Sequence, residues 1–118
     1  MPTTHTARTL RTSASLAAST AAVCTEWDNT TKYGGIVCVR LTNGAAAPTT
    51  APQVQFFTGE ATGVKRQYYA QAGDTVANSV IDVVCEFDHK PMFVNVTITN
   101  GATNAVTADA VVQEVTTV

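Results

Sequence analysis

Apolar and polar residues alternate along most of this chain, which is the period expected of β-strands that bury one face. The clearest run covers residues 35–42, where Val37, Val39 and Leu41 are expected to point inward and the residues between them outward. A helix is an alternative only for residues 13–23, where alanines permit it but the neighbouring serines and threonines disfavour it. The pattern therefore predicts an all-β protein.

Further runs of the same kind occur between residues 53 and 115. They lie at residues 53–57, 63–70, 79–87, 92–99 and 104–115. Their expected inward residues are Val54, Phe56, Ile81, Val83, Cys85, Phe87, Met92, Val94, Val96, Ile98, Val106, Ala108, Ala110 and Val112. The polar, basic and aromatic run at 63–70 is expected at a sheet edge.

The stretch that ends at Trp27 is expected to form one or two more strands, with Val23 and Trp27 on one face and Cys24 and Glu26 on the other. The total is about eight short strands separated by turn signals, which is typical of antiparallel sheets packed face to face. The sequence therefore predicts an antiparallel two-sheet sandwich.

The tetrapeptide Thr-Asn-Gly-Ala occurs twice, at residues 42–45 and 99–102, each time at the end of a strand-like run. Asn-Gly pairs are common in turns because both residues tolerate a positive φ angle. A proline-containing segment follows the first copy, whereas the second leads quickly into the last run. We interpret the repeat as turn chemistry used at two topologically different places, and not as an internal duplication.

The first twelve residues differ from the rest, and we divide the chain into an N-terminal extended arm, residues 1–12, and a single β-sandwich domain, residues 13–118. The arm has no acidic residue and carries Arg8 and Arg11 on either side of Leu10. We expect the two guanidinium groups to grip carboxylates on a neighbouring subunit, with Leu10 in an apolar notch. The alternative is that the arm joins the edge of its own sheet.

The amino-acid composition also favours β-strands and limits the kinds of binding partner that the protein can have. The chain has 118 residues, with 21 Thr, 18 Ala and 16 Val, and only 14% of its residues are charged. β-Branched residues favour strands. The net charge of −2 provides no basic field for nucleic acid. No apolar run is long enough for a membrane-spanning helix, and serines interrupt the only segment that resembles an export signal, so we expect synthesis in the cytoplasm without export.

The cysteines and the ionisable residues suggest no chemistry. Cys24, Cys38 and Cys85 have no metal-ligand spacing and are expected to be free thiols, with a Cys38–Cys85 bridge as the alternative. His5 and His89 stand alone. No catalytic pair or phosphate-binding loop is recognisable, so we expect a protein without enzymatic activity, metal or cofactor.

Aromatic residues leave one binding mode open, because Trp27, Tyr33 and the Tyr68-Tyr69 pair could form a platform for a sugar. The two adjacent tyrosines are expected on opposite faces of a strand, so at most one could contribute. The competing interpretation places Trp27 and one tyrosine in or beside the core.

The run YGGIVCVRLTNGAAAPTTAPQVQFFTGE, residues 33–60, resembles a pattern of small tailed-phage virion proteins. Its parts are a glycine pair, a strand ending in Thr-Asn-Gly, a Pro/Thr-rich crossover and a second strand. The chain thus resembles head decoration (cement or staple) proteins. This resemblance implies a jelly-roll or immunoglobulin-like sandwich on the capsid outer surface, which braces the major capsid protein and forms homo-oligomers, with a dimer favoured. The alternatives are a tail or receptor/carbohydrate-binding module and a secreted bacterial adhesion domain.

Overall fold

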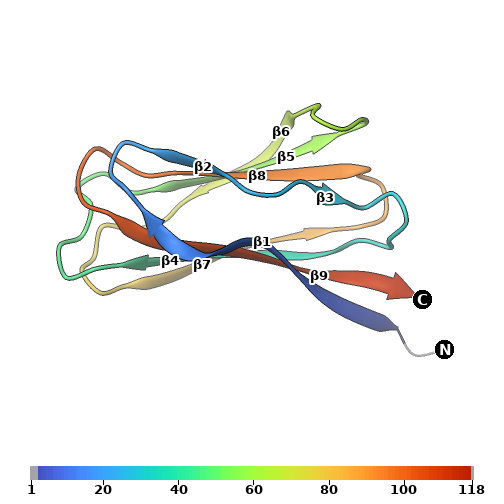
Figure 1. Cartoon of the computed structure of the whole chain (residues 1–118), viewed down its shortest axis with the longest axis horizontal. Helices are drawn as coiled ribbons and strands as arrows, with labels where there is room; N and C mark the ends of the chain where they lie inside the picture. The colour runs from blue at the N-terminus through green and yellow to red at the C-terminus, as the bar shows by residue number, and fades with distance from the viewer. Residues whose placement is uncertain (1–2, 118) are drawn as a thin grey trace.

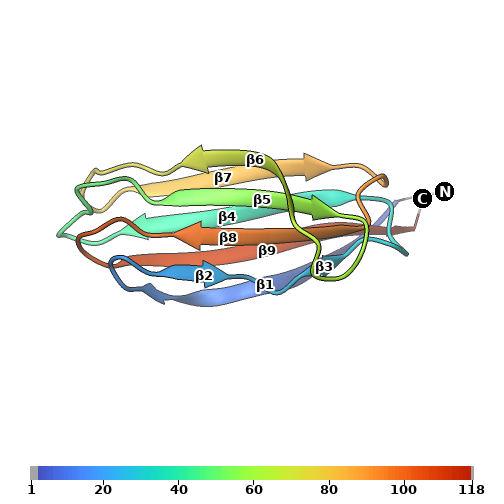
Figure 2. The same cartoon turned by 90° about the horizontal axis from the view of Figure 1, so that it is seen from above.

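A computed structural model describes residues 3–117 and shows two antiparallel β-sheets packed face to face (Figures 1 and 2). Sheet I has the strand order β1 (Thr4–Leu16), β9 (Val106–Thr117), β4 (Gly35–Asn43) and β7 (Val80–Phe87). Sheet II has the order β2 (Ala21–Val23), β8 (Phe93–Thr99), β5 (Gln53–Gly59) and β6 (Arg66–Ala72), and the short β3 (Trp27–Asp28) also pairs with β8. The predicted all-β sandwich is confirmed.

Strands that follow one another in the chain mostly lie in different sheets. The chain crosses between sheets after β1, β3, β4, β6, β7 and β8, and only β5 and β6 are successive strands that pair with each other. Figure 1 shows these crossings at the two ends of the sandwich. The last two strands, β8 and β9, both lie in the interior of their sheets. The sandwich is therefore built mainly from pairings between distant parts of the sequence.

The core follows the alternation expected from the sequence. The inward residues of β4, β5, β7, β8 and β9 are buried, except that Ile81 is only partly buried. Met92 was expected in this series but is 45% exposed, because β8 begins one residue later. Cys24 and Trp27 are both buried while Val23 is 63% exposed. The expectation for this stretch was wrong because residues 24–26 are not in a strand, so alternation does not continue through them.

Both copies of the repeated tetrapeptide stand where a strand ends and the chain crosses to the other sheet, so their topological roles are more alike than expected. Positive φ angles occur at neither Asn-Gly pair. The two asparagines act through buried side chains: the Asn43 amide donates to Asp74 and Val76, and the Asn100 amide donates to the carbonyls of Leu16 and Asn104.

The two crossovers also pack together. Thr49 donates its amide N–H to the Thr103 hydroxyl over 2.9 Å, and Asn104 donates to the Ala47 carbonyl over 2.8 Å. A side chain at Gly101 would meet the Thr50 carbonyl oxygen at 2.4 Å, so this close approach requires glycine. The repeated motif thus fixes one end of the sandwich.

Candidate functional site

The described part of the predicted arm, residues 3–12, does not extend away from the domain. From Thr4 it forms the first part of β1, which continues without interruption past residue 12 to Leu16 and pairs with β9 as an edge strand of sheet I. Residues 1 and 2 of the arm lie outside the described residues. Register shifts interrupt the β1–β9 pairing, which explains why this strand shows no regular alternation in the sequence.

The three residues proposed to hold a partner all make contacts within the chain. Leu10 is 3% exposed and belongs to the core. Arg11 donates to the carbonyls of Ala108 and Ala14, over 3.2 and 3.4 Å. Arg8 donates to a carboxylate of β9 (below). The structure thus places this segment at the edge of its own sheet, and an additional role of these residues toward a partner stays a prediction.

Glu114 is the carboxylate that receives Arg8, and it lies almost fully inside the sandwich. Its Oε1 atom is 3.1 Å from Nη2 of Arg8, and its Oε2 atom accepts a hydrogen bond of 2.9 Å from Nε1 of Trp27 on β3. The side chain of Glu114 is 1% exposed. This one carboxylate therefore joins the edge strand β1 to β9 and to the opposite sheet.

The surroundings of Glu114 keep it ionised. Burial acts to raise the pKa of Glu114, but the hydrogen bonds from Arg8 and Trp27, with the positive charges of Arg8 and Lys32, outweigh burial and bring this pKa below its ordinary value. Gly35 lies opposite Glu114 on β4, and a Cβ atom there would come within 3.0 Å of the Glu114 Cα. The glycine allows the two strands to approach at this point.

The outer face of sheet I is unusually apolar for a surface that faces away from the core. Val84 of β7, Cys38 of β4 and Val111 of β9 lie side by side in one row across the sheet. Ile36 and Val80 stand on the same face, with Ile36 in the next row and Val80 two rows away, beyond the row of Arg40 and Asp82. Ile36, Val80 and Val84 are 42–52% exposed. We name Ile36, Cys38, Val80, Val84 and Val111 the apolar strip.

Charged and polar residues border the apolar strip. Arg40 makes two hydrogen bonds to Asp82, of 2.8 and 3.1 Å, in the row on one side. The row on the other side has Ile36 between Glu86 and Gln113. Exposed apolar side chains with polar residues around them are common at protein–protein interfaces.

The outer face of sheet II differs from this arrangement. Its exposed and half-exposed positions are largely polar and include Gln53, Gln55, Thr97 and Thr99, but Phe57 and Phe93 are half-exposed on this face as well. Val23 is an exposed aliphatic side chain at its border. An antiparallel sheet with one solvated face normally alternates in this way. Sheet I departs from that rule and sheet II largely follows it.

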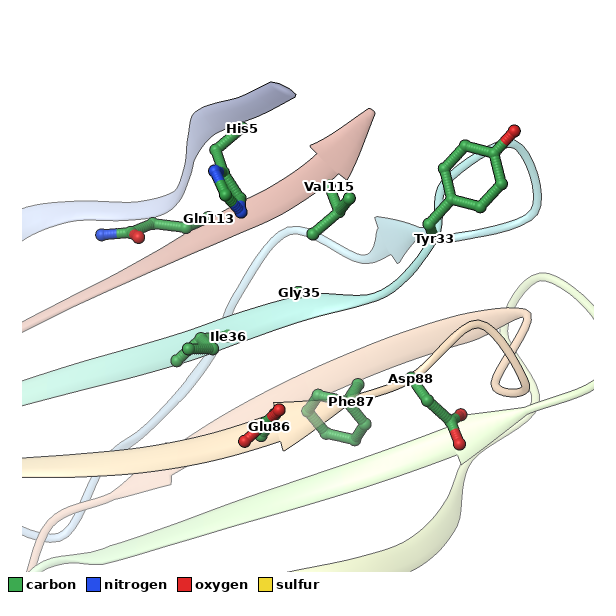
Figure 3. Close-up of a pocket in the computed structure, with 9 residues that line it drawn as sticks. All are labelled: His5, Tyr33, Gly35, Ile36, Glu86, Phe87, Asp88, Gln113 and Val115. Carbon is green, nitrogen blue, oxygen red and sulfur yellow. The ribbon is translucent and has the colours of Figure 1, made fainter. Parts of the chain in front are cut away.

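A hollow of about 350 Å³ adjoins the apolar strip at the end of sheet I where β1 begins and β9 ends (Figure 3). It is lined by His5, Tyr33, Gly35, Ile36, Glu86, Phe87, Asp88, Gln113 and Val115. Figure 3 shows these side chains coming from all four strands of sheet I and from the turn before β4. Within residues 3–117 no group of three or more His, Cys, Asp and Glu side chains could hold a metal ion.

All three cysteines are free, as expected. Cys38 points to the outer face whereas Cys85, on the neighbouring strand, is buried, and the residue opposite Cys38 is Val84. Burial raises the pKa of Cys24 to about 11 despite the nearby charge of Arg11. The pKa of Cys38 and that of Cys85 are raised chiefly by burial as well. The thiols are therefore poor nucleophiles at neutral pH.

Of the two interpretations of Trp27, the one that placed it in the core is confirmed, because Trp27 is 0% exposed and cannot contact a sugar. The expectation for the two tyrosines needs revision. The pairing of β5 with β6 shifts register between Phe56 and Phe57, so that Tyr68 becomes an extra residue opposite this step. As a result Tyr68 lies against Phe87 and Tyr69 lies against Phe56, and the two tyrosines do not simply point to opposite faces.

Comparisons with known proteins show the fold. No protein-family model matches this chain, and no curated protein matches its sequence. A solved structure described as "Bacillus endospore appendages form a novel family of disulfide-linked pili" aligns over 100% of this chain and 93% of its own, with a TM-score of 0.57 and 15% identity.

Two further structures are similar. The SPBc2 prophage-derived protein YomS aligns over 96% of both chains, with a TM-score of 0.52 and 14% identity. A chain in the structure of infectious bursal disease virus, Gx strain, has a TM-score of 0.50 and 9% identity, over 95% of this chain but only 32% of that one. At such identities the similarity establishes a shared β-sandwich fold, found in pilus, prophage and viral proteins, and does not establish a shared function.

Within the described residues there is no helix able to cross a membrane. The candidate site is the outer face of sheet I, because it carries the apolar strip and the hollow beside it.

Proposed function

We propose that this protein is a structural component of a virion, a decoration protein that binds the outer surface of the capsid through the apolar strip of sheet I and stabilises contacts between major capsid proteins. The observation that carries the proposal is the difference between the two outer faces of the sandwich. One face presents several aliphatic side chains that are about half exposed, and the other is more polar, although it carries the half-exposed Phe57 and Phe93. Clustered exposed apolar side chains with a polar border favour binding to another protein.

The strand order supports the proposal. We infer a jelly roll, because the orders β1-β9-β4-β7 and β2-β8-β5-β6 place successive strands of the chain opposite one another in the two sheets. Jelly rolls are frequent among viral capsid domains and lectins. The resemblance of residues 33–60 to small virion proteins and the shared fold with a prophage-derived protein point in the same direction. Fold alone does not define function, so the docking face remains the main argument.

We also propose that the protein acts as a homo-oligomer, with a dimer favoured, as the resemblance to decoration proteins implies. Sedimentation velocity at several concentrations measures this directly. A monomer at all concentrations would contradict this part of the proposal and leave the docking face untouched.

The experiment that tests the main proposal is quantitative mass spectrometry of purified particles. We expect the protein on the particle at a copy number comparable with that of the coat protein, and we expect its loss to lower the temperature at which particles release DNA. A few copies per particle would instead indicate a tail component, and absence from particles would refute the proposal.

A second function is favoured by one observation, the alignment with a pilus protein over 100% of this chain. A fibre subunit would use the same fold to assemble with copies of itself. Electron microscopy of the purified protein separates the two functions, because a fibre subunit forms filaments without a capsid whereas a decoration protein remains dispersed until shells are added.

A further inference from the structure

A second hollow, of about 500 Å³, opens at the edge of the sandwich between β6 and the end of β7. It is lined by Tyr68, Glu86, Phe87, Asp88, Lys90 and Pro91. It lies beside the apolar strip but contains none of its five residues. Its lining combines an aromatic ring with two carboxylates and an ammonium group.

Tyr68 supplies a rigid platform. The register shift in β6 turns this side chain toward the core, where its ring centroid lies 5.3 Å from that of Phe87. Phe87 is buried and also contacts Trp27 and Phe56, with ring centroids 6.2 and 6.3 Å away. Tyr68 is nevertheless 58% exposed. Part of its ring therefore rests on a packed aromatic cluster, and the remainder is open to a ligand.

The polar groups beside Tyr68 include both acceptors and donors. The Glu86 carboxylate is exposed, and it takes part in none of the ion pairs found among residues 3–117. Asp88 accepts a hydrogen bond of 2.8 Å from the Lys90 amide and lies 3.6 Å from its ammonium group. The backbone hydrogen bond from Lys90 is the main cause that lowers the pKa of Asp88, so this carboxylate is ionised at neutral pH.

The turn that carries these groups is held from inside the protein. Asn29 is 1% exposed, and its amide nitrogen donates to the carbonyls of Asp88 and Pro91, over 3.0 and 2.8 Å. Its side-chain oxygen accepts from the Gly34 amide. Gly34 has a φ angle of 93°, and a Cβ there would overlap the Phe87 carbonyl, so the loop packs directly on the backbone at the end of β7. The backbone of this turn is therefore preorganised, which lowers the entropic cost of binding.

We propose that this hollow binds an uncharged saccharide, with Tyr68 stacked on the C–H face of a pyranose ring and Glu86, Asp88 and Lys90 hydrogen-bonded to its hydroxyl groups. A sugar hydroxyl can both donate and accept, so it suits a lining with two carboxylates and one ammonium group. The lining carries one net negative charge from Glu86, Asp88 and Lys90, so it repels acidic sugars. This inference does not rest on the proposed docking of sheet I, although the two sites share Glu86.

Saturation-transfer NMR on the full-length protein tests the inference. The probes are the methyl glycosides of glucose, galactose, mannose and N-acetylglucosamine, with glucuronic acid and N-acetylneuraminic acid as acidic comparisons. We expect transfer to at least one of the four uncharged glycosides and none to the acidic sugars. Lack of transfer to all four, or transfer to the acidic sugars alone, would overturn the inference.

Three variants locate the site. Tyr68→Ala is expected to abolish the signal and Tyr68→Phe to retain it, because stacking needs the ring and not the hydroxyl. Tyr69→Phe is the matched control, since Tyr69 packs on Phe56 and does not line the hollow. Circular dichroism checks that the variants fold. If Tyr68→Phe also loses the signal while folded, or if Tyr68→Ala binds like the wild type, the proposed stacking is wrong.

Discussion

At the scale of single residues, the least expected feature is a carboxylate within the core. Glu114 is in phase with the inward residues of β9, so strict alternation through residue 114 was the signal that could have identified it. Breaking a buried ion pair by removing one partner is costly because the other charge stays buried. Removal of Arg8 or Trp27 would therefore leave the buried Glu114 carboxylate without one of its hydrogen-bond donors and destabilise the fold.

The pH dependence of stability should reveal this carboxylate. Because its folded pKa is lowered, the unfolded state binds more protons, and Glu114 stabilises the fold above its unfolded pKa and loses that effect as pH falls through its folded pKa. In Arg8→Met the influence of burial is no longer outweighed by Arg8, and the pKa of Glu114 should rise. We expect a smaller gain in stability with pH for Arg8→Met than for the wild type, measured by urea unfolding between about pH 3 and 7.

Arg40→Met provides the matched control, because it removes an arginine from an exposed pair with Asp82. Exposed ion pairs contribute little to stability. If the unfolding free energy of Arg8→Met falls with decreasing pH as steeply as that of the wild type, the role assigned to Glu114 is contradicted.

Thiol reactivity gives a second test at this scale. Cys38 is only half-buried on the outer face, whereas Cys24 and Cys85 lie in the core. We expect one faster-reacting thiol in the native protein, absent in Cys38→Ser, and three reactive thiols after denaturation without reductant. A single reactive thiol in the denatured protein would indicate a disulfide.

At the scale of elements, β1 marks where sequence reasoning succeeded and where it stopped. The inward faces of β4, β5, β7 and β8 were predicted because apolar and polar residues alternate along each of these strands, and no register shift interrupts the β4–β7 and β5–β8 pairings. β1 was not, since register shifts break its phase and Leu10 is the only large aliphatic side chain in its first part. The sequence left open a sugar platform at Tyr68 and Tyr69 but did not show which tyrosine lines a hollow, because a register shift is invisible in a pattern of period two.

Leu10→Ala tests whether β1 belongs to the core. Replacing a buried leucine by alanine costs about 2–5 kcal/mol of unfolding free energy, and Leu10 is 3% exposed. We expect a loss in this range by chemical denaturation. Thr9→Ala, on an exposed position of the same strand, should have little effect. Equal stability of Leu10→Ala and the wild type would mean that this residue serves a partner instead.

At the scale of the whole molecule, the question is which surface meets another protein. Val84→Asp places a charge in the middle of the apolar strip, where the side chain is 51% exposed and the fold should tolerate it. We expect it to abolish binding to undecorated shells, measured by co-sedimentation, because a buried unpaired charge is strongly unfavourable in an interface. Thr97→Asp makes the same change on the outer face of sheet II and should bind normally. Retained binding by Val84→Asp would exclude this face.

The positions of β8 and β9 have a consequence for synthesis on the ribosome. β1 pairs only with β9, and β2 and β3 pair only with β8, so a nascent chain that ends before residue 93 holds just two ribbons, β4 with β7 and β5 with β6. Neither sheet can be completed until residues 93–117 have been made. Such non-local pairing folds slowly and leaves strand edges exposed meanwhile. Until β9 has left the ribosome, these unpaired edges are open to pairing with other chains.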